Sequence, residues 1–294
     1  MEDTVWRVSA HPGATAVTGP TGREADDMAT RNKHVIWPRE VWKATTQAER
    51  VEMVDEYAIG ALENPERLLV LLEHPNDFVR ARSVCALEHE DTPAIRAFMR
   101  AAMADAHADV RTSATDAISC YRDTRDITRL VIALAGDPSW FVRSSAASAL
   151  GNIGHKSAAR ALEAALRDDC APIVRRDAAA AMVAVGAKNA YRALCAGLSR
   201  ERNRYARIGM SIGLYTFGDR AARRRLLRAM SSRNMFVLGN IFNFDLAEHI
   251  RPEDYRAFRR RASRVAETHD MDVVKQEAAA FIARLDERLA SPEA

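Results

Sequence analysis

Hydrophobic and polar positions along the chain follow the period of an amphipathic helix, and one such helical pattern returns about every 32 residues. A valine and an arginine stand next to each other near the start of most copies. The pairs are Val79 and Arg80, Val110 and Arg111, Val142 and Arg143, and Val174 and Arg175, continuing as Ala206 and Arg207 and fading at Val237 and Leu238. A glycine closes three copies, at Gly154, Gly186 and Gly218. The pattern predicts an all-α repeat protein.

Each pair begins a stripe of apolar residues on one helical face. Counted from the arginine, the preceding residue and the residues three, six and seven places further share that face. The stripe reads Val142, Ala146, Ala149 and Leu150 in one copy, Val110, Ala114, Ala117 and Ile118 in the copy before it, and Val174, Ala178, Ala181 and Met182 in the copy after it. Small residues let adjacent helices come close, and the larger last residue fills the remaining space. We expect these stripes to form the core.

Each copy is predicted to contain a first helix, a tight turn and a second helix that starts around the Val-Arg pair. A proline after a capping residue supports helix starts at Asn64, Thr92 and Asp137. The predicted helix pairs are 65–74 with 77–89, 93–104 with 108–120, 124–134 with 138–151, 156–167 with 172–185, 188–198 with 203–216, and 219–230 with 234–246. Such a unit buries its apolar face only against a neighbour, so the pairs are expected to stack into an α-solenoid of about six units.

Both ends of the chain depart from the repeat. The expected segments are a flexible or loosely docked arm at 1–36, an N-terminal capping segment at 37–63, the repeat solenoid at 64–246 and C-terminal capping helices at 247–294. Trp37 and Trp42 either staple the capping segment to the first helices or hold a ligand.

The C-terminal helices are expected to turn an apolar face inward. That face holds Tyr255, Phe258, Ala262, Val273, Val274, Ala278, Phe281, Ile282, Leu285 and Leu289. The last repeat is rich in large apolar residues, with Phe236, Ile241, Phe242 and Phe244. It either packs against the capping helices or forms an exposed docking site.

The arginine of each pair lies in the first turn of its helix, where its charge opposes the helix dipole. An acidic residue in the turn before a second helix, in the same repeat or a neighbouring one, is the expected partner. The candidates are Asp77, Asp109, Asp137, Asp168 or Asp169, and Glu201. These arginines are therefore interpreted as structural, with contact to a ligand as the alternative.

Composition narrows the class of protein. Of the 294 residues, 48% are hydrophobic and only 6% aromatic, so small and aliphatic side chains build the core. Apolar runs are too short to cross a bilayer and the first residues lack the layout of a signal peptide, so a cytoplasmic location is expected, away from membranes. Cys85, Cys120, Cys170 and Cys195 lie far apart and are predicted to be buried or half-buried free thiols. Neither a metal nor a cofactor is predicted.

One copy of the repeat carries its motif most fully, in Asp137, Val142, Arg143, Ala146, Ala147, Ala149, Leu150, Gly151, Ile153 and Gly154. This pattern resembles a HEAT repeat, in particular the short variety first associated with phycobilisome bilin lyase subunits. The resemblance covers roughly residues 65–246. It implies a solenoid whose second helices line a concave groove. Repeats of this kind occur in scaffolds, lyase subunits and DNA glycosylases, so the resemblance implies no single activity.

Positions outside the apolar stripe would face such a groove. They carry mainly short hydroxyl and amide groups, which suit hydrogen bonds to a peptide or a helix. The candidate partner-binding residues are Arg82, Thr112, Asp116, Ser145, Ser148, Asn152, Arg176, Asp177, Asn240 and Asn243. A solvated helix face without a partner is the alternative.

Charge is uneven along the chain, although the net charge is only +3. Acidic residues outnumber basic ones between residues 45 and 125, and arginines dominate between residues 199 and 264. Arginine forks suit phosphate and carboxylate groups. The candidate contacts to an anion or a nucleic acid are Arg200, Arg204, Arg223, Arg224, Arg225, Arg259 and Arg260. The alternative is an ion-paired, solvated surface.

Catalytic patterns find little support. A HEAT-type metal hydroxylase would need several His-Glu pairs on successive helices, and only His89 with Glu90 is present. Residue types of a HEAT-like DNA glycosylase occur at Trp140, Asp116, Asp177 and Arg176, but their positions do not reproduce its motif. The sequence favours a non-catalytic scaffold that binds a protein or peptide along its concave groove, and it leaves enzymatic activity open. The alternatives are a nucleic-acid-binding repair protein of the glycosylase type and a bilin-lyase-like subunit.

Overall fold

The computed structural model describes residues 72–242 and 246–290. The chain divides into two compact units, residues 1–87 and residues 88–294. In the N-terminal unit the described helix is α5 (Asp77–Leu87), whose apolar face is buried at Val79, Val84 and Leu87. The arm predicted at 1–36 and the capping segment predicted at 37–63, with Trp37 and Trp42, lie outside the described residues.

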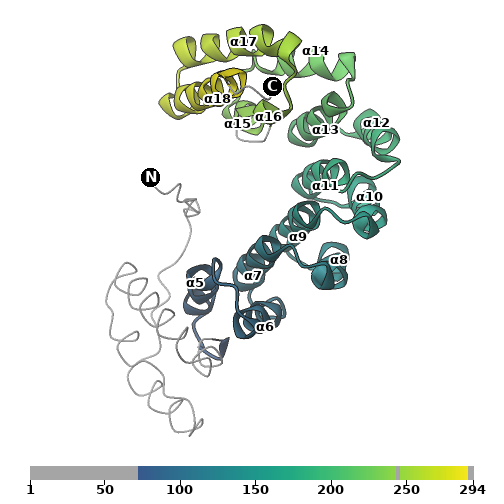
Figure 1. Cartoon of the computed structure of the whole chain (residues 1–294), viewed down its shortest axis with the longest axis vertical. Helices are drawn as coiled ribbons and strands as arrows, with labels where there is room; N and C mark the ends of the chain where they lie inside the picture. Colours follow the sequence, from purple (N-terminus) through teal and green to yellow (C-terminus); the bar gives the residue numbers. More distant parts are fainter. Residues whose placement is uncertain (1–71, 243–245, 291–294) are drawn as a thin grey trace, which may run out of the picture. The chain divides into compact units, whose positions relative to one another are not determined.

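The described part of the C-terminal unit is helical and contains no strand, which confirms the all-α prediction (Figure 1). Its helix pairs are α6 (Pro93–Ala102) with α7 (Ala108–Tyr121), η1 (Thr124–Asp126) and α8 (Ile127–Gly136) with α9 (Trp140–Ile153), η2 (Lys156–Ala158) and α10 (Ala159–Asp168) with α11 (Pro172–Ala184), α12 (Ala190–Arg200) with α13 (Arg204–Thr216), and α14 (Arg220–Ala229) with α15 (Met235–Phe242). Four further elements follow, namely α16 (Leu246–His249), η3 (Pro252–Asp254), α17 (Tyr255–Thr268) and α18 (Asp272–Ala290).

Helices of the C-terminal unit stack in two rows. The second helices α7, α9, α11 and α13 each pack against the next, and the first helices α8, α10 and α12 form a row behind them (Figure 1). Packing is closer within the row of second helices, which makes that row the inner side of a curved stack. The stacked pairs confirm the predicted solenoid.

Small residues make the close packing of the inner row feasible. Every predicted stripe residue in the copies around Arg111, Arg143 and Arg175 is buried. A Cβ placed on Gly151 of α9 would lie 3.1 Å from the Cα and Cβ atoms of Ala181 in α11. Larger side chains at this crossing would push the two helices apart.

The repeat-closing glycines hold the chain in a left-handed turn. The φ angle is +70° at Gly154, +61° at Gly186 and +87° at Gly218. A residue with a Cβ atom adopts this conformation at a cost of roughly 1–2 kcal/mol. After α7 the same place is taken by Arg122, with a φ of +47°. The repeat therefore keeps this turn even where the glycine is missing.

Two of the predicted helix starts can be checked directly. Thr92 caps α6 as predicted, because its hydroxyl accepts the N–H of Ile95 at 3.2 Å. The start predicted at Asp137 is wrong. Asp137 ends α8, and its carboxylate accepts the N–H of Ser139 at 2.9 Å, so α9 begins only at Trp140.

The C-terminal helices close the stack with an apolar face that was largely predicted. Phe258, Val274 and Phe281 are buried, and the rings of Phe242 and Phe281 lie 5.3 Å apart. Val273 and Leu289 do not belong to that face, since each is 47% exposed. They stand in the first and last turns of α18, which has 19 residues and is longer than α17 with its 14.

The aromatic last repeat is divided between core and surface. Ile241 and Phe242 are buried, as packing against the capping helices requires. Phe236 is 58% exposed and touches Tyr205 of α13 edge-on, with ring centroids 5.9 Å apart. Phe244 lies outside the described residues.

The predicted burial of the thiols holds for two of the cysteines. Cys85 and Cys195 are half-buried, whereas Cys120 and Cys170 are exposed, each on or beside the end of a helix. Among the helices that the structure describes, none combines the length and the apolar character that crossing a bilayer requires.

Candidate functional site

Arginines at the start of the second helices are tied to carboxylates of the following repeat. Their Nε and Nη2 atoms donate to both carboxylate oxygens, at 2.8 and 2.8 Å for Arg111 with Asp137, 2.7 and 3.0 Å for Arg143 with Asp169, and 2.6 and 2.9 Å for Arg175 with Glu201. The Nη1 atom of each arginine donates to two backbone carbonyls in the turn before its helix. We call these three pairs the rim ladder. Bidentate pairing of this kind fixes both the distance and the orientation of neighbouring repeats.

The rim ladder is largely shielded from water. The side chains of Arg143 and Asp169 are 11% and 7% exposed. Burial is the largest single influence on Asp137 and Glu201 and raises their pKa values. The hydrogen bonds from their arginines, those from backbone N–H groups and the nearby arginine charge together outweigh burial, so the pKa of each carboxyl lies below its ordinary value. The predicted pairing of these arginines with acids of a neighbouring repeat is confirmed.

Two of the proposed ladder acids are wrong. Asp109 stands in the first turn of α7, where its side chain is 75% exposed and lies beside His107. Asp168 belongs to the last turn of α10 and pairs with its neighbour Arg167 at 2.6 Å. The acids that do serve stand just after a first helix, where the chain turns toward the next arginine.

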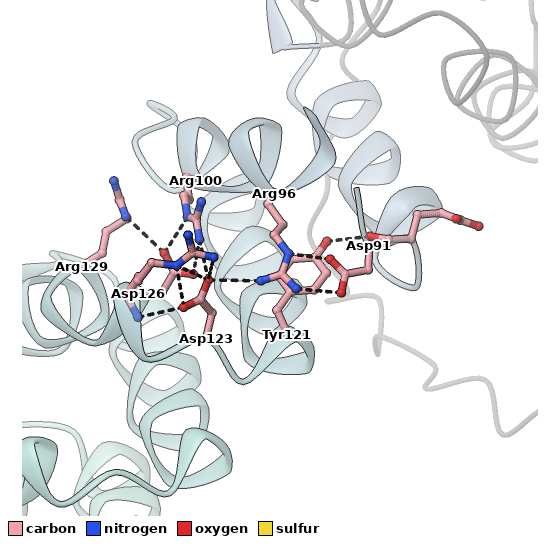
Figure 2. Close-up of polar contacts among 9 residues, drawn as sticks. Asp91, Arg96, Arg100, Tyr121, Asp123, Asp126 and Arg129 are labelled. Carbon is pink, nitrogen blue, oxygen red and sulfur yellow. Dashed lines mark hydrogen bonds and ion pairs between the residues drawn. The ribbon is translucent and has the colours of Figure 1, made fainter. Parts of the chain in front are cut away.

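A second charged cluster joins α6 to the start of the next repeat (Figure 2). Arg100 binds both oxygens of Asp126, at 2.7 and 2.9 Å, and Arg96 donates to Asp123 at 3.1 Å. Asp126 is almost fully buried. The pKa of Asp123 lies well below its ordinary value because Arg125 hydrogen-bonds to its carboxyl.

This cluster was not predicted from the sequence, although the sequence contains a signal for it. Arg100 and Asp126 are 26 residues apart, the same separation as in the rim ladder. Arg96 also lies 4.8 Å above the ring of Tyr121, whose hydroxyl donates to the carbonyl of Glu90 at 3.0 Å. The charged groups of this cluster are thus paired within the chain. We interpret the cluster as a second contact that holds neighbouring repeats together.

Predicted groove residues gather on the inner row, where several bind one another. The Ser144 hydroxyl donates to Asp177, whose other oxygen accepts from Nε of Arg176 at 2.7 Å. Nη1 of Arg176 then donates to the side-chain oxygen of Asn240 at 3.0 Å. These bonds connect α9, α11 and α15, so residues up to 96 positions apart in sequence share one surface.

Gly209 of α13 makes this connection feasible. A Cβ on Gly209 would lie 2.4 Å from Cγ of Arg176, so the missing side chain gives Arg176 a path across α13. Nothing in the repeat pattern singles out Gly209, because the neighbouring repeats have Asp177 and Ser145 at the matching position. The path became visible only in three dimensions.

Other predicted groove residues stay open to solvent. Asp116 on α7 and Ser148 and Asn152 on α9 are exposed, and the Asn152 amide makes only a long contact of 3.5 Å to Ser119. Thr112 donates back to its own helix, at the carbonyl of Ala108. We define the polar inner face as Asp116, Ser144, Ser145, Ser148, Asn152, Arg176, Asp177 and Asn240.

Besides Thr112, two predicted groove residues are not part of the polar inner face as defined. Arg82 lies on α5 of the N-terminal unit. Asn243 lies outside the described residues.

Asp116 combines an exposed surface with an unfavourable environment for its charge. The residue as a whole is exposed, but desolvation by the surrounding protein raises the pKa of the Asp116 carboxyl to about 6. A hydrogen bond from Ser145 acts in the opposite direction, and the negative charge of Glu88 adds to the rise. Near neutral pH the Asp116 carboxylate is therefore an anionic hydrogen-bond acceptor on the inner face, and its ionisation is less favourable than that of an ordinary aspartate.

The arginines of the predicted C-terminal basic sector differ in their hydrogen bonds and in their exposure to solvent. Arg223 pairs with Asp254, and Arg259 binds both oxygens of Asp286 at 2.9 and 3.1 Å. Arg200 bonds back to its own helix, Arg225 makes a long contact of 3.4 Å to Ser211, and the remaining three, Arg204, Arg224 and Arg260, are exposed.

The structure brings some of these arginines together. Arg223 and Arg224 line a pocket of about 380 Å³ with Arg220 and Arg251, which the sequence analysis did not select. The same pocket contains Glu253 and Asp254, so its positive charge is partly balanced.

Comparison with known proteins agrees with this geometry. Residues 117–183 match the family model described as HEAT repeats. The helix pairs within this range match HEAT repeats. The matched residues include Arg143 and Asp169 of the rim ladder and most residues of the polar inner face. No curated protein sequence matches the chain.

Solved structures share the HEAT-repeat architecture at low sequence identity. The complex of CpcE and CpcF of phycocyanin lyase from Nostoc sp. PCC7120 is similar with a TM-score of 0.54 and 16% identity, over 76% of this chain and 94% of that chain. YibA of Escherichia coli is similar with a TM-score of 0.51 and 15% identity, over 90% of this chain and 98% of that chain. At such identities the likeness concerns the fold alone.

Proposed function

We propose that this chain is a non-catalytic HEAT-repeat scaffold whose polar inner face binds a protein or peptide partner. The observation that carries the proposal is the row of exposed Asp116, Ser148 and Asn152 beside a closed network of hydrogen bonds. Short acceptors and donors of this kind can bind the backbone of an extended segment or the polar side of a helix.

Rigidity of the surface supports the same function. The network from Ser144 through Asp177 and Arg176 to Asn240 fixes α9, α11 and α15 against one another. A partner then meets hydrogen-bonding groups that are already in place, which lowers the entropy lost on binding. A solenoid also presents its inner face continuously, so a long partner segment can contact several repeats.

Photo-crosslinking in the native host tests this proposal. Ser148 is replaced by the photoreactive amino acid benzoylphenylalanine in the full chain, and Ile132 of α8, which is 67% exposed on the outer row, serves as the matched control position. We expect light to join Ser148 to one discrete protein and to leave Ile132 without that product. Equal products at both positions, or none at Ser148, would refute the inner face as the binding surface.

A second candidate is a bilin-lyase-like subunit, which the fold likeness to the CpcE and CpcF complex favours. Such a protein would hold a bilin against the inner face. Titration of a free bilin with the purified chain distinguishes the candidates. A saturable shift of the bilin absorbance supports this candidate, and an unchanged spectrum removes it.

Nucleic-acid binding through the basic sector stays a prediction. The exposed Arg204, Arg224 and Arg260 are its best support. Titration of random duplex DNA at rising salt tests it, because phosphate contacts lose affinity steeply with salt. A cytoplasmic location likewise stays a prediction.

A further inference from the structure

The rim ladder stops at α13, although its arginine continues. Arg207 stands at the ladder position of α13, and its Nη1 atom donates to the carbonyls of Glu201 at 2.7 Å and Leu198 at 3.1 Å. The same anchoring orients the three ladder arginines. Within the described part of the chain, however, the bonds of Arg207 are these two, and its Nε and Nη2 atoms meet no carboxylate.

A single replacement in the following repeat explains why the fourth rung is incomplete. Each ladder acid also accepts the backbone N–H two residues further on, from Ser139 to Asp137 at 2.9 Å, from Ala171 to Asp169 at 2.8 Å and from Asn203 to Glu201 at 2.8 Å. In the next repeat Ser232 makes this bond, with the N–H of Asn234 at 3.1 Å. Ser232 therefore occupies the place of the acid and brings no charge to Arg207.

Arg207 itself lines a pocket of about 360 Å³. Its lining includes Ser199 of α12, Arg207 of α13, and Asp219 and Arg225 of α14. Asp219 is already bound, since it caps α14 at the N–H of Ala222 and accepts from the Tyr191 hydroxyl at 3.0 Å. The lining of this pocket thus holds two arginines and one aspartate.

We propose that this pocket binds a carboxylate group supplied from outside the chain, which completes the fourth rung of the ladder. The three closed rungs show what the fork of Arg207 accepts, namely a planar carboxylate held by Nε and Nη2. Arg225 adds a second positive charge at the pocket wall. The carboxylate comes from an acidic side chain of a protein or from a small dicarboxylate. The site is formed by α12, α13 and α14 and does not depend on the polar inner face.

Binding of defined probes to the full chain tests the site. A fluorescein-labelled peptide of alternating Gly and Glu is compared with the same peptide carrying Gln, and succinate and inorganic phosphate are used as competitors. We expect the Glu peptide to bind at least about tenfold more tightly than the Gln peptide, because only a carboxylate pairs with the fork. If succinate displaces the Glu peptide at a concentration below that of the peptide, the ligand is a small dicarboxylate. If the Glu peptide stays bound, the ligand is an acidic protein segment.

Ser232→Asp is the decisive variant because it supplies the missing carboxylate from within the chain. It is expected to raise the melting temperature of the chain and to weaken binding of the Glu peptide at least about tenfold. Arg225→Gln is expected to weaken binding of the Glu peptide without raising the melting temperature. Arg204→Gln replaces an exposed arginine of α13, is the matched control and should change neither property. Arg207 itself stays unchanged, since its Nη1 bonds hold the turn before α13.

Several results would overturn the proposal. The first is a Ser232→Asp variant that is less stable than the parent or that binds the Glu peptide as tightly as the parent does. The second is equal affinity for the Gln peptide and the Glu peptide. The third is displacement of the Glu peptide by phosphate at a lower concentration than by succinate. The first result would contradict the assignment of Ser232 to the ladder, and the other two would contradict selectivity for a carboxylate.

Discussion

The rim ladder and the polar inner face are built from similar residue types, but they treat their polar groups differently. On the rim, Arg111, Arg143 and Arg175 each close on a carboxylate and on carbonyls of the chain itself. On the inner face, Arg176 and Asp177 are bound, while Ser148 next to them stays exposed. The difference suggests that the rim holds repeats together and that the inner face keeps hydrogen-bonding capacity for a partner.

Breaking one rung of the ladder should have the largest effect on stability. Arg143→Met keeps the aliphatic stem but leaves Asp169 and two backbone carbonyls without their donor. We expect the free energy of unfolding to fall by about 3 kcal/mol, because removal of one partner leaves a shielded charge unpaired. Urea unfolding followed by circular dichroism measures this change.

Two controls sharpen this test. Arg204→Met removes an exposed arginine, and Ser148→Ala removes an exposed hydroxyl of the inner face; each should alter the free energy of unfolding by no more than about 0.5 kcal/mol. If Arg143→Met costs no more than these controls, the rim does not hold the repeats together.

Gly209→Ala tests the bound part of the inner face. The added methyl group would meet Cγ of Arg176, so Arg176 must move and lose Asn240. We expect a loss of about 1 kcal/mol in unfolding free energy, despite the higher helix propensity of Ala. In an Arg176→Ala background the same change should be neutral or stabilising, and a double-mutant cycle measures the difference. Additive effects would mean that Arg176 does not cross α13 at Gly209.

Asp116→Asn tests the open part of the inner face through pH. The folded-state pKa of Asp116 is about 6, above the ordinary value of 3.8, so its ionisation opposes folding and stability is lost as pH rises through about 6. The variant escapes this loss. It should be more stable than the parent above pH 6 by about 1 kcal/mol, allowing for solvent screening of an exposed group, and the difference should shrink toward pH 4.

Thermal unfolding between pH 4.5 and 7.5 measures this effect. Ser145→Ala is the matched variant, since loss of its hydrogen bond should steepen the pH dependence of the parent. A constant difference between Asp116→Asn and the parent at all pH values would show that Asp116 is not desolvated.

Much of the fold was predictable because the repeat encodes it locally. The spacing of Val142, Ala146 and Leu150 marks a buried helical face, and the structure buries all three. The regularly recurring glycines Gly154 and Gly186 mark left-handed turns. Repetition makes each such signal visible several times, whereas features that occur once, such as the cap predicted at Asp137 and the burial of Cys120 and Cys170, were predicted wrongly.

The candidate site was less predictable because its contacts join distant repeats. A helical pattern tells which face Arg176 occupies, but not that its side chain crosses α13 to reach Asn240, 64 positions later. It also does not tell which of Asp168 and Asp169 turns toward Arg143. These choices depend on the curvature of the stack, which the pattern of one repeat does not contain.

Hydrogen exchange of the full chain with its cross-linked or co-purified partner tests the central claim most directly. The account predicts slower exchange on binding in residues 108–121, 140–153 and 172–184 of the inner row, with no change in residues 127–136 and 159–168 of the row behind it. Protection confined to the outer row, or spread equally over both rows, would contradict the polar inner face as the surface that binds a partner.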